Sequence, residues 1–434
     1  MNLDLTVRTL GEGSVPSPIF ELRKLSKVKD QLQQLFTEER RIRFDASLPP
    51  KPGTEGLSFE SPSLPRNIFF EPARTKVAIV SCGGLCPGLN CVIRGLVLDL
   101  HYWYGINDVW GIRYGYSGIL PAADPPPKKL TPELVSDIHK QGGTMLGSSR
   151  GDPGVGKIVD SLSSQGFNIL YCIGGDGTLR GAHAIAEEIT RRRLAIAVIG
   201  VPKTIDNDIP LVYRSFGFQT AVEEARKVLD CAHVEAKGAK NGVGLVKLMG
   251  RAAGFIAAHA TNASGEANYC LIPEITFPLE GENGFLEHLR HRLAQKRHAV
   301  IALAEGAGQH LIGASNQRDA SGNTLFNDVG LFLKEKIEKT FKAWGDEIHI
   351  KYFDPSYTVR SVPANSADCI FCADLARHSV NAAMAGKTDM LIGHWHGEFT
   401  HVPLAAIQGL KKRIDPTTRL WRTVLATTGQ PPEW

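Results

Sequence analysis

Residues 168–178 read NILYCIGGDGT, an apolar run that ends in two glycines, an aspartate and a third glycine. A helical pattern begins at about Thr178. The run has the length of a buried β-strand, because such strands span about four to eight residues whereas helices need roughly ten or more. This stretch therefore predicts a strand, a polar loop and a helix in succession.

The same pattern repeats on both sides of this stretch. TKVAIVSC (75–82) precedes a helical pattern from about Leu89, and AIAVIGV (195–201) precedes one from about Gln219. VGLVKL, NYCLIP, HAVIALAE and IHIKYF follow, each with a helical stretch after it. Strands and helices that alternate at this spacing form parallel βαβ units. We therefore predict an α/β protein whose ligands bind beyond the carboxyl ends of the strands.

Residues 1–74 have a different composition. A charged, helix-prone stretch (21–44) precedes a segment rich in Pro, Ser and Gly (47–67). The region is either an arm that packs on another surface or a loosely packed tail.

The overall composition restricts the possible functions. The chain has 434 residues, 43% of them hydrophobic, enough for two or three domains. Forty-nine Lys and Arg against 45 Asp and Glu argue against a protein that binds nucleic acid through charge. No run approaches the roughly 20 apolar residues of a membrane helix, and the first 25 residues lack the apolar region of a secretory signal. We expect a cytoplasmic protein without a membrane span.

The cysteines and histidines do not predict a metal centre. The eight cysteines are typical of reduced, buried thiols, and Cys369 and Cys372 form a CxxC inside a helical pattern without a second such pair. His394 and His396 are predicted to share one strand face. Because no third ligand is near, we interpret them as ordinary hydrogen-bonded histidines.

Two glycine-rich loops that follow strands are suited to phosphate. GGLCPGLN (83–90) and GGDGT (174–178) each lead into a predicted helix, whose free N–H groups and dipole favour an anion. Asp176 is a hard oxygen ligand placed to hold Mg²⁺ directly or through water. The alternatives are packing turns and, for Asp176, a helix N-cap.

A third loop carries the residues of an acid–base site. PKTIDND (202–208) places Asp206 and Asp208 beside Lys203 and Thr204. A kinase needs a carboxylate that accepts a hydroxyl proton, with cations and metal to neutralise the phosphoryl group. The alternative is a surface turn with solvated charges, which the apolar sequence after it disfavours.

Cations for a second phosphate occur later in the chain. Arg251 follows VGLVKL, and Lys351, Tyr357 and Arg360 lie in KYFDPSYTVR. These groups suit charge-assisted hydrogen bonds to a phosphate, although each alone is more often a surface residue. Glu305 ends HAVIALAE and is either a sugar-hydroxyl acceptor or a capping charge.

Eight motifs, in their order along the chain, resemble those of the 6-phosphofructokinase family over about residues 75–410. They are GGLCPGLN, GGTMLGSSRGD, GGDGT, PKTIDND, SFGFQTA, MGRAAGF, AEGAG and PSYTVR. The resemblance is strongest to the longer ATP-using branch of the family, found in plants and trypanosomatids. The resemblance implies two Rossmann-like three-layer α/β/α subdomains after an N-terminal extension (1–74). The nucleotide and Mg²⁺ subdomain would comprise 75–217 and about 364–410. The sugar-phosphate subdomain would comprise 218–363 and the C-terminal segment.

The resemblance also implies a reaction, phosphoryl transfer from ATP to the 1-hydroxyl of fructose 6-phosphate in glycolysis, giving fructose 1,6-bisphosphate and ADP, with Mg²⁺. Asp206 would be the catalytic base, flanked by Thr204 and Asp208 and assisted by Lys203 and Arg251. The nucleotide-binding residues would be Gly84, Arg150, Gly151, Gly175, Asp176, Gly177 and Thr178, with Asp176 on the metal. The sugar-phosphate residues would be Thr204, Asp206, Met249, Gly250, Arg251, Glu305, Lys351, Tyr357 and Arg360.

The sequence departs from the short bacterial enzymes of this family at three positions. Those enzymes have Gly where this chain has Lys203, Arg where it has Gly242, and His where it has Tyr357. Lys203 resembles pyrophosphate-dependent enzymes, but these carry Asp at the place of Gly177, where a carboxylate would collide with an α-phosphate. We therefore predict ATP as the donor, with a pyrophosphate-dependent enzyme as the alternative.

Other classes of protein are less favoured. A non-catalytic regulatory homologue would be expected to lack Asp176 or Asp206, and this chain has both. A lipid or NAD kinase can share a GGDG loop, but it would not be expected to have PKTIDND, MGR and PSYTVR together, as this chain does. The family resemblance favours an allosteric homotetramer, with a homodimer as the alternative.

Overall fold

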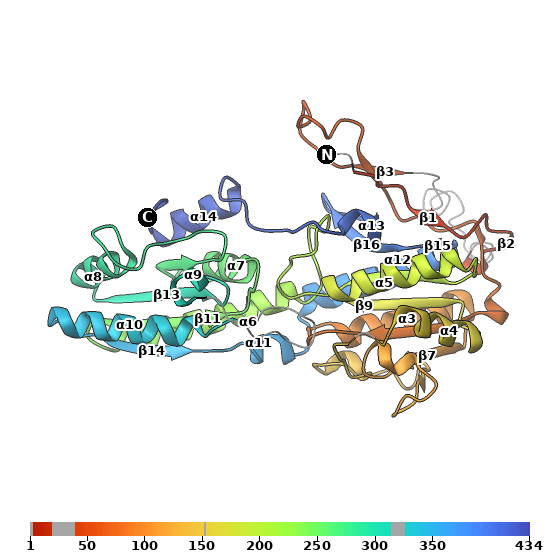
Figure 1. The fold of residues 1–434 in the computed structure, drawn as a ribbon, viewed down its shortest axis with the longest axis horizontal. Coiled ribbons are helices and arrows are strands. Elements are labelled where there is room, and N and C mark those ends of the chain that lie inside the picture. The colour runs from red at the N-terminus through yellow and green to blue at the C-terminus, as the bar shows by residue number, and fades with distance from the viewer. Residues whose placement is uncertain (1–2, 20–39, 152, 314–325) are drawn as a thin grey trace, which may run out of the picture. The chain divides into compact units, whose positions relative to one another are not determined.

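The computed structural model describes residues 3–19, 40–151, 153–313 and 326–434, which form two compact units, each with its own sheet and helices (Figure 1). Unit 1 consists of Met1–Thr204, Ile209–Gly217 and Val362–Leu410. Unit 2 consists of Ile205–Asp208, Phe218–Ser361 and Lys411–Trp434. The chain therefore first leaves unit 1 within the PKTIDND segment.

Unit 1 is built on a nine-stranded sheet with a parallel centre in the order β16, β10, β9, β6, β7. These strands are β6 (Lys76–Ser81), β7 (Asp108–Ile112), β9 (Ile169–Gly174), β10 (Ala197–Pro202) and β16 (Met390–Trp395). Every residue of β9 and β10 is buried. The apolar runs of the sequence are thus the central strands, which helices cover on both faces.

Antiparallel strands complete the two edges of this sheet. One edge carries β17 (Glu398–Pro403), β4 (Ser58–Glu60) and β3 (Arg41–Arg43), and the other carries β8 (Lys128–Lys129). Smaller ladders join β1 (Arg8–Thr9) to β15 (Lys387–Thr388), and β2 (Val15–Pro16) to β5 (Asn67–Ile68). The described part of the N-terminal region is therefore packed on unit 1. Within the helix-prone stretch 21–44, residues 21–39 lie outside the described residues and β3 is a strand.

The helices of unit 1 pack in pairs. The first pair is α3 (Leu89–Tyr104) with α12 (Ser366–Met384), and the second is α4 (Val155–Ser164) with α5 (Asp176–Arg191). Short helices are α13 (Leu404–Ile407) and the 3₁₀ turns η2 (Pro72–Arg74), η3 (Tyr116–Ile119) and η4 (Ile138–Lys140). The predicted helix starts agree with the structure, because α3 begins at Leu89 and α5 two residues before Thr178.

Unit 2 has a four-stranded, fully parallel sheet in the order β12, β13, β11, β14. The strands are β11 (Gly242–Leu248), β12 (Tyr269–Leu271), β13 (His298–Ala304) and β14 (His349–Phe353). The helices are α6 (Phe218–Lys237), α7 (Phe255–Ser264), α8 (Phe285–Lys296), α9 (Gln309–Ile312), α10 (Val329–Trp344), α11 (Thr358–Ser361) and α14 (Arg419–Thr428). Side chains of α8 and α10 share one buried apolar cluster with the strands.

The predicted fold class, α/β with mainly parallel sheets, is confirmed. The CxxC lies in α12 as expected. The prediction that His394 and His396 share one strand face is wrong, because β16 ends at Trp395 and His396 follows in a turn with a positive φ of 50°. None of the helices in the described ranges is long and apolar enough to cross a membrane.

Candidate active site

In unit 1 three loops converge on Lys203, at the carboxyl ends of the neighbouring strands β6, β9 and β10. The Lys203 backbone N–H donates to the Gly174 carbonyl (3.0 Å), and its ammonium donates to the Gly84 carbonyl (2.5 Å). A Cβ on Gly175 would lie 3.3 Å from the Lys203 carbonyl oxygen. Lys203 is only 5% exposed. Its two hydrogen bonds therefore join the β10 loop to both glycine-rich loops.

The segment that carries Arg150 and Gly151 is attached to the first glycine loop. The Gly83 N–H donates to the Ser149 carbonyl (3.0 Å), and the Ser148 hydroxyl donates to the Gly83 carbonyl (2.7 Å). Gly83 has a φ of +86°, which a residue with a side chain rarely adopts. The glycine there permits this pairing, which places the 147–151 segment beside Gly84.

The GGDGT loop leads directly into α5, as the sequence predicts. Asp176 lies at the first position of the helix, and its carboxylate is 3.3 Å from the guanidinium of Arg180 one turn later. Both side chains are more than half exposed. Thr178 is buried, and its carbonyl accepts a hydrogen bond from the Tyr116 hydroxyl (2.9 Å). A Cβ on Gly177 would have Arg180 as its nearest neighbour, at 3.9 Å, so the space beside this glycine is open.

In unit 2 most of the predicted sugar-phosphate residues follow three neighbouring strands: Met249, Gly250 and Arg251 follow β11, Glu305 follows β13, and Tyr357 and Arg360 follow β14. The Glu305 N–H donates to the Leu248 carbonyl (2.9 Å), and the Gly306 N–H donates to the Gly250 carbonyl (3.2 Å). A Cβ on Gly306 would lie 2.0 Å from the Arg251 carbonyl oxygen. Only glycine therefore permits the β13 loop to run this close to the MGR segment.

Glu305 lies among positive charges. Burial raises the pKa of Glu305, whereas the charges of Lys247, Arg251 and Arg360 oppose that shift. The Arg360 guanidinium lies 4.9 Å from the centre of the Tyr357 ring, which is 76% exposed. Arg251, Glu305, Tyr357 and Arg360 are thus grouped at one sheet edge. Lys351 lies within β14 and is exposed, and Met249 is half-buried between β11 and the MGR turn.

Lys247, which the sequence analysis did not single out, organises this edge. Its ammonium lies 2.8 Å from Asp328, the N-cap of α10, and 2.8 Å from Asp354, which precedes the PSYTVR segment. Burial lowers the pKa of Lys247, but the hydrogen bonds to Asp328 and Asp354 outweigh it and raise the pKa overall. A lone cation in an otherwise apolar strand was the sequence signal for this role. Lys247 therefore holds the start of α10 and the loop leading to Arg360.

Segment 205–208, which the sequence predicts to carry the base, belongs to unit 2, and its Asp208 lies near a cation from the C-terminal region. Burial lowers the pKa of Lys412 to about 7, and the nearby Asp208 opposes the shift. The Lys412 ammonium lies 5.1 Å from the Phe255 ring centre. The Glu274 carboxylate accepts from the backbone N–H of both Gly254 (3.0 Å) and Ile414 (2.9 Å). Segment 411–414 is thereby fixed to the start of α7, a contact that nothing in the sequence indicated.

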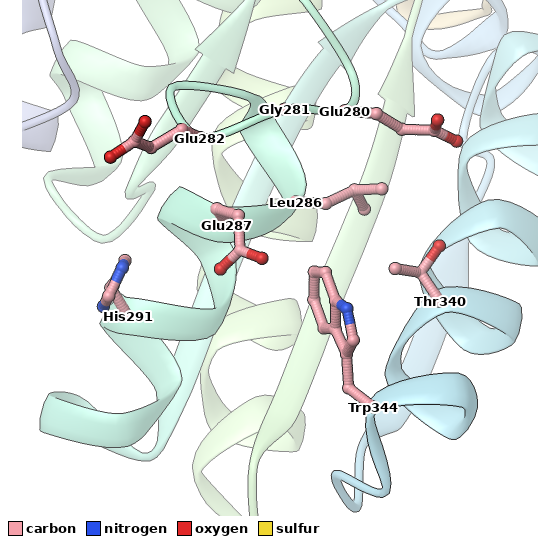
Figure 2. Close-up of a pocket in the computed structure, with 8 residues that line it drawn as sticks. All are labelled: Glu280, Gly281, Glu282, Leu286, Glu287, His291, Thr340 and Trp344. Atoms are coloured by element: carbon pink, nitrogen blue, oxygen red, sulfur yellow. The ribbon is translucent and has the colours of Figure 1, made fainter.

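A separate cavity of about 450 Å³ in unit 2 is lined by none of these residues (Figure 2). Its walls come from the 280–287 turn, α8 and α10, and include Glu280, Glu282, Glu287, His291 and Trp344. Three carboxylates would repel a phosphate. This cavity is therefore not a phosphate site.

Glycine loops at helix starts in unit 1 and grouped cations in unit 2 define an α/β enzyme that handles phosphate groups. The phosphofructokinase family model matches residues 76–383, and the chain belongs to that family. The family resemblance drawn from the eight motifs is confirmed.

Several named relatives match most of the chain. An ATP-dependent 6-phosphofructokinase of Borreliella burgdorferi is 45% identical over 99% of this chain and 97% of that protein. ATP-dependent 6-phosphofructokinase 7 of Arabidopsis thaliana is 48% identical over 88% of this chain and 79% of that protein. A pyrophosphate-dependent phosphofructokinase structure from Nitrosospira multiformis superposes with a TM-score of 0.67 at 19% identity, covering 82% of this chain and 92% of that one. At this identity the structural match shows the fold alone.

Lys247→Met should destabilise unit 2, because it leaves two carboxylates without their shared cation. We expect the free energy of unfolding to fall by about 1–3 kcal/mol, measured by chemical denaturation. Lys240→Met is the matched control, since the Lys240–Glu347 pair is exposed on both sides and should contribute less than about 1 kcal/mol. Equal losses in the two variants would contradict the role given to Lys247.

Proposed function

We propose that this protein transfers the γ-phosphoryl group of ATP to the 1-hydroxyl of fructose 6-phosphate, giving fructose 1,6-bisphosphate and ADP in glycolysis. The observation that carries the proposal is the convergence of the β6, β9 and β10 loops on Lys203, three residues before Asp206. The relatives named as ATP-dependent 6-phosphofructokinases, at 42–48% identity, support it.

Unit 1 would bind the nucleotide. The backbone at Gly84, Gly151, Gly175 and Gly177 permits close approach of the phosphates, with Arg150 as a cation and Thr178 in the first turn of α5. Asp176 fits Mg²⁺, because an exposed carboxylate at the start of a helix that faces bound phosphates is the kind of ligand this ion takes. Bound there, Mg²⁺ would neutralise charge on the phosphates.

Unit 2 would bind the sugar phosphate. Arg251 and Arg360, with Lys351 and the Tyr357 hydroxyl, supply donors for the 6-phosphate. Glu305 would accept hydrogen bonds from sugar hydroxyls, with the Met249 and Gly250 backbone beside it. The nearby cations favour the ionised form of Glu305 that this role needs, against the burial that raises its pKa.

Asp206 would take the proton of the attacking hydroxyl as the oxygen bonds to the γ-phosphorus. Lys203 and Arg251 would offset the negative charge that develops on the transferred group. Thr204 and Asp208 would orient the reacting hydroxyl and the base on either side. The Asp206 proton then passes to solvent when product leaves.

The donor is proposed as ATP because the space beside Gly177 is open. Pyrophosphate is the second candidate, since Lys203 can stabilise the transfer of a phosphoryl group from either donor. A non-catalytic homologue is disfavoured, because Asp176 and Asp206 are both present. We also propose a cytoplasmic location, from the composition of the first 25 residues, and an allosteric homotetramer or homodimer, from the family resemblance.

Asp206→Asn retains the size of the side chain but cannot accept the proton. We expect kcat to fall by roughly 10²–10⁴ while KM for fructose 6-phosphate changes little. Asp346→Asn is the control, because Asp346 pairs with Arg290 on the surface of the same unit and should leave kcat unchanged. A variant at Asp206 that keeps more than about a third of kcat would show that another group is the base.

Arg360→Ala removes a donor to the 6-phosphate in both the ground state and the transition state. KM for fructose 6-phosphate should therefore rise by roughly 10- to 100-fold, with a smaller effect on kcat. Arg290→Ala serves as the surface control in unit 2, and initial rates over a range of sugar concentrations give both constants. An unchanged KM would place the phosphate elsewhere.

Gly177→Asp tests the donor, because it puts a carboxylate beside the expected α-phosphate. Activity with ATP should fall by about 10²-fold or more through repulsion and bulk, while pyrophosphate activity should survive or appear. Gly177→Ala and Gly177→Asn separate size from charge, since the added Cβ has its nearest neighbour at 3.9 Å. Steady-state rates with both donors decide the matter. Wild type that prefers pyrophosphate, or a Gly177→Asp variant that uses ATP normally, would overturn the ATP proposal.

A further inference from the structure

Two cysteines far apart in the sequence meet in unit 1. Cys91 lies in the first turn of α3 and Cys369 in the first turn of α12, and their Sγ atoms are 3.7 Å apart. The two helices pack against each other. A disulfide requires an S–S distance of about 2.05 Å, so the sulfurs have to approach by less than about 2 Å. We propose that Cys91 and Cys369 are a reversible oxidation site that closes to a disulfide.

The other cysteines near this pair are less suited to bonding. Cys372, the second cysteine of the CxxC, is fully buried, and burial raises the pKa of its thiol well above the ordinary value. Cys86 is only 1% exposed, and its thiol donates to the Phe216 carbonyl at 3.3 Å. The reactive partner of Cys369 is therefore Cys91, 278 residues away in sequence, rather than its neighbour in the CxxC.

The two cysteines do not belong to a candidate metal site. Within the described ranges, the one group of three metal-type ligands is His183, Glu187 and Asp389. Its carboxylates already bind the guanidinium of Arg8, at 2.7 Å from Glu187 and 3.4 Å from Asp389. The thiols of Cys91 and Cys369 also contact the His139 (3.9 Å) and Ala364 (3.3 Å) carbonyls, and they lie against each other in the arrangement for a disulfide.

Burial sets the order of events. Cys369 is partly exposed, whereas Cys91 is 8% exposed and burial raises the pKa of its thiol to about 12. The more accessible Cys369 sulfur therefore reacts first with hydrogen peroxide, taking one oxygen as a sulfenic acid while the peroxide is reduced and water is released. The Cys91 sulfur then attacks the Cys369 sulfur and expels the oxygen as a second water. An external thiol reverses the reaction by exchange.

The first turn of α3 supports the proposed donor site. Gly88 caps the helix after the Gly83–Gly88 loop. Asn90, beside Cys91, accepts from the Met145 N–H (2.8 Å) and donates to the Gln141 carbonyl (3.2 Å), which holds the segment leading to Arg150. Drawing Cys91 toward α12 displaces this turn and both loops. This consequence depends on the proposed function, and we expect oxidation to raise KM for ATP by about threefold or more.

The test uses the reduced full-length protein, treated with hydrogen peroxide and then blocked with N-ethylmaleimide. Non-reducing tryptic digestion should yield residues 77–94 joined to residues 361–377, and fragment ions should assign the bond to Cys91 and Cys369. Cys91→Ser and Cys369→Ser should each abolish the joined peptide, with a thermal melt to show that each variant is folded. Cys231→Ser is the control, because Cys231 is an exposed cysteine in unit 2.

Three results would overturn the inference. The first is a joined peptide that persists in a folded Cys91→Ser or Cys369→Ser variant. The second is a wild-type protein that gives no joined peptide although dimedone traps Cys369 as a sulfenic acid. A disulfide that forms without changing KM for ATP would overturn the coupling to the donor site. Because the peptide is detected by mass, an inactive wild-type protein would count against the proposed function and not against the disulfide.

Discussion

The hydrogen bonds from Lys203 to Gly174 and Gly84 are the constraint on which the candidate donor site depends. The backbone N–H holds the end of β9 and the ammonium holds the loop after β6, so a single residue fixes three loops that separate strands deliver. Because Lys203 is 5% exposed, its ammonium has lost most of its water, and the Gly84 carbonyl replaces part of that hydration. A residue that would otherwise be a mobile surface cation is thereby an ordered charge at the sheet edge.

Unit 2 uses charge in a complementary way. Its edge groups Lys247, Arg251 and Arg360 around Glu305, and two further carboxylates, Asp328 and Asp354, neutralise Lys247. Because Lys247 is already paired with these carboxylates, it positions the segments that carry them. The pairing follows from burial: the Lys247 side chain is 13% exposed and has to be paired within the protein.

The sequence predicted the elements well where the physical signal is local. Runs such as ILYCIG are buried on every face and therefore show as continuous apolar stretches, and glycines mark the loops that follow. The prediction that His396 shares a strand face with His394 failed, because a turn residue and a strand residue look alike in the sequence when both are polar and adjacent to Trp395. The sequence also did not show that residues 41–43 and 58–60 join the main sheet, since antiparallel edge pairing such as His401 with Glu60 depends on contacts more than 300 residues apart.

The same limit explains which site residues were missed. Lys247 could have been found, because a cation in an apolar strand needs a partner, but its partners Asp328 and Asp354 are identified only by the order of β11, β13 and β14. Lys412 and Glu274 had no signal, since their neighbours come from segments that are sequentially remote. Cys369 was noticed for its spacing to Cys372, yet the side of α12 that faces α3 decides its partner. Short-range patterns thus predict which residue types stand at a strand end, whereas the pairing of charges and thiols is set by how the sheet order and helix faces bring distant segments into contact.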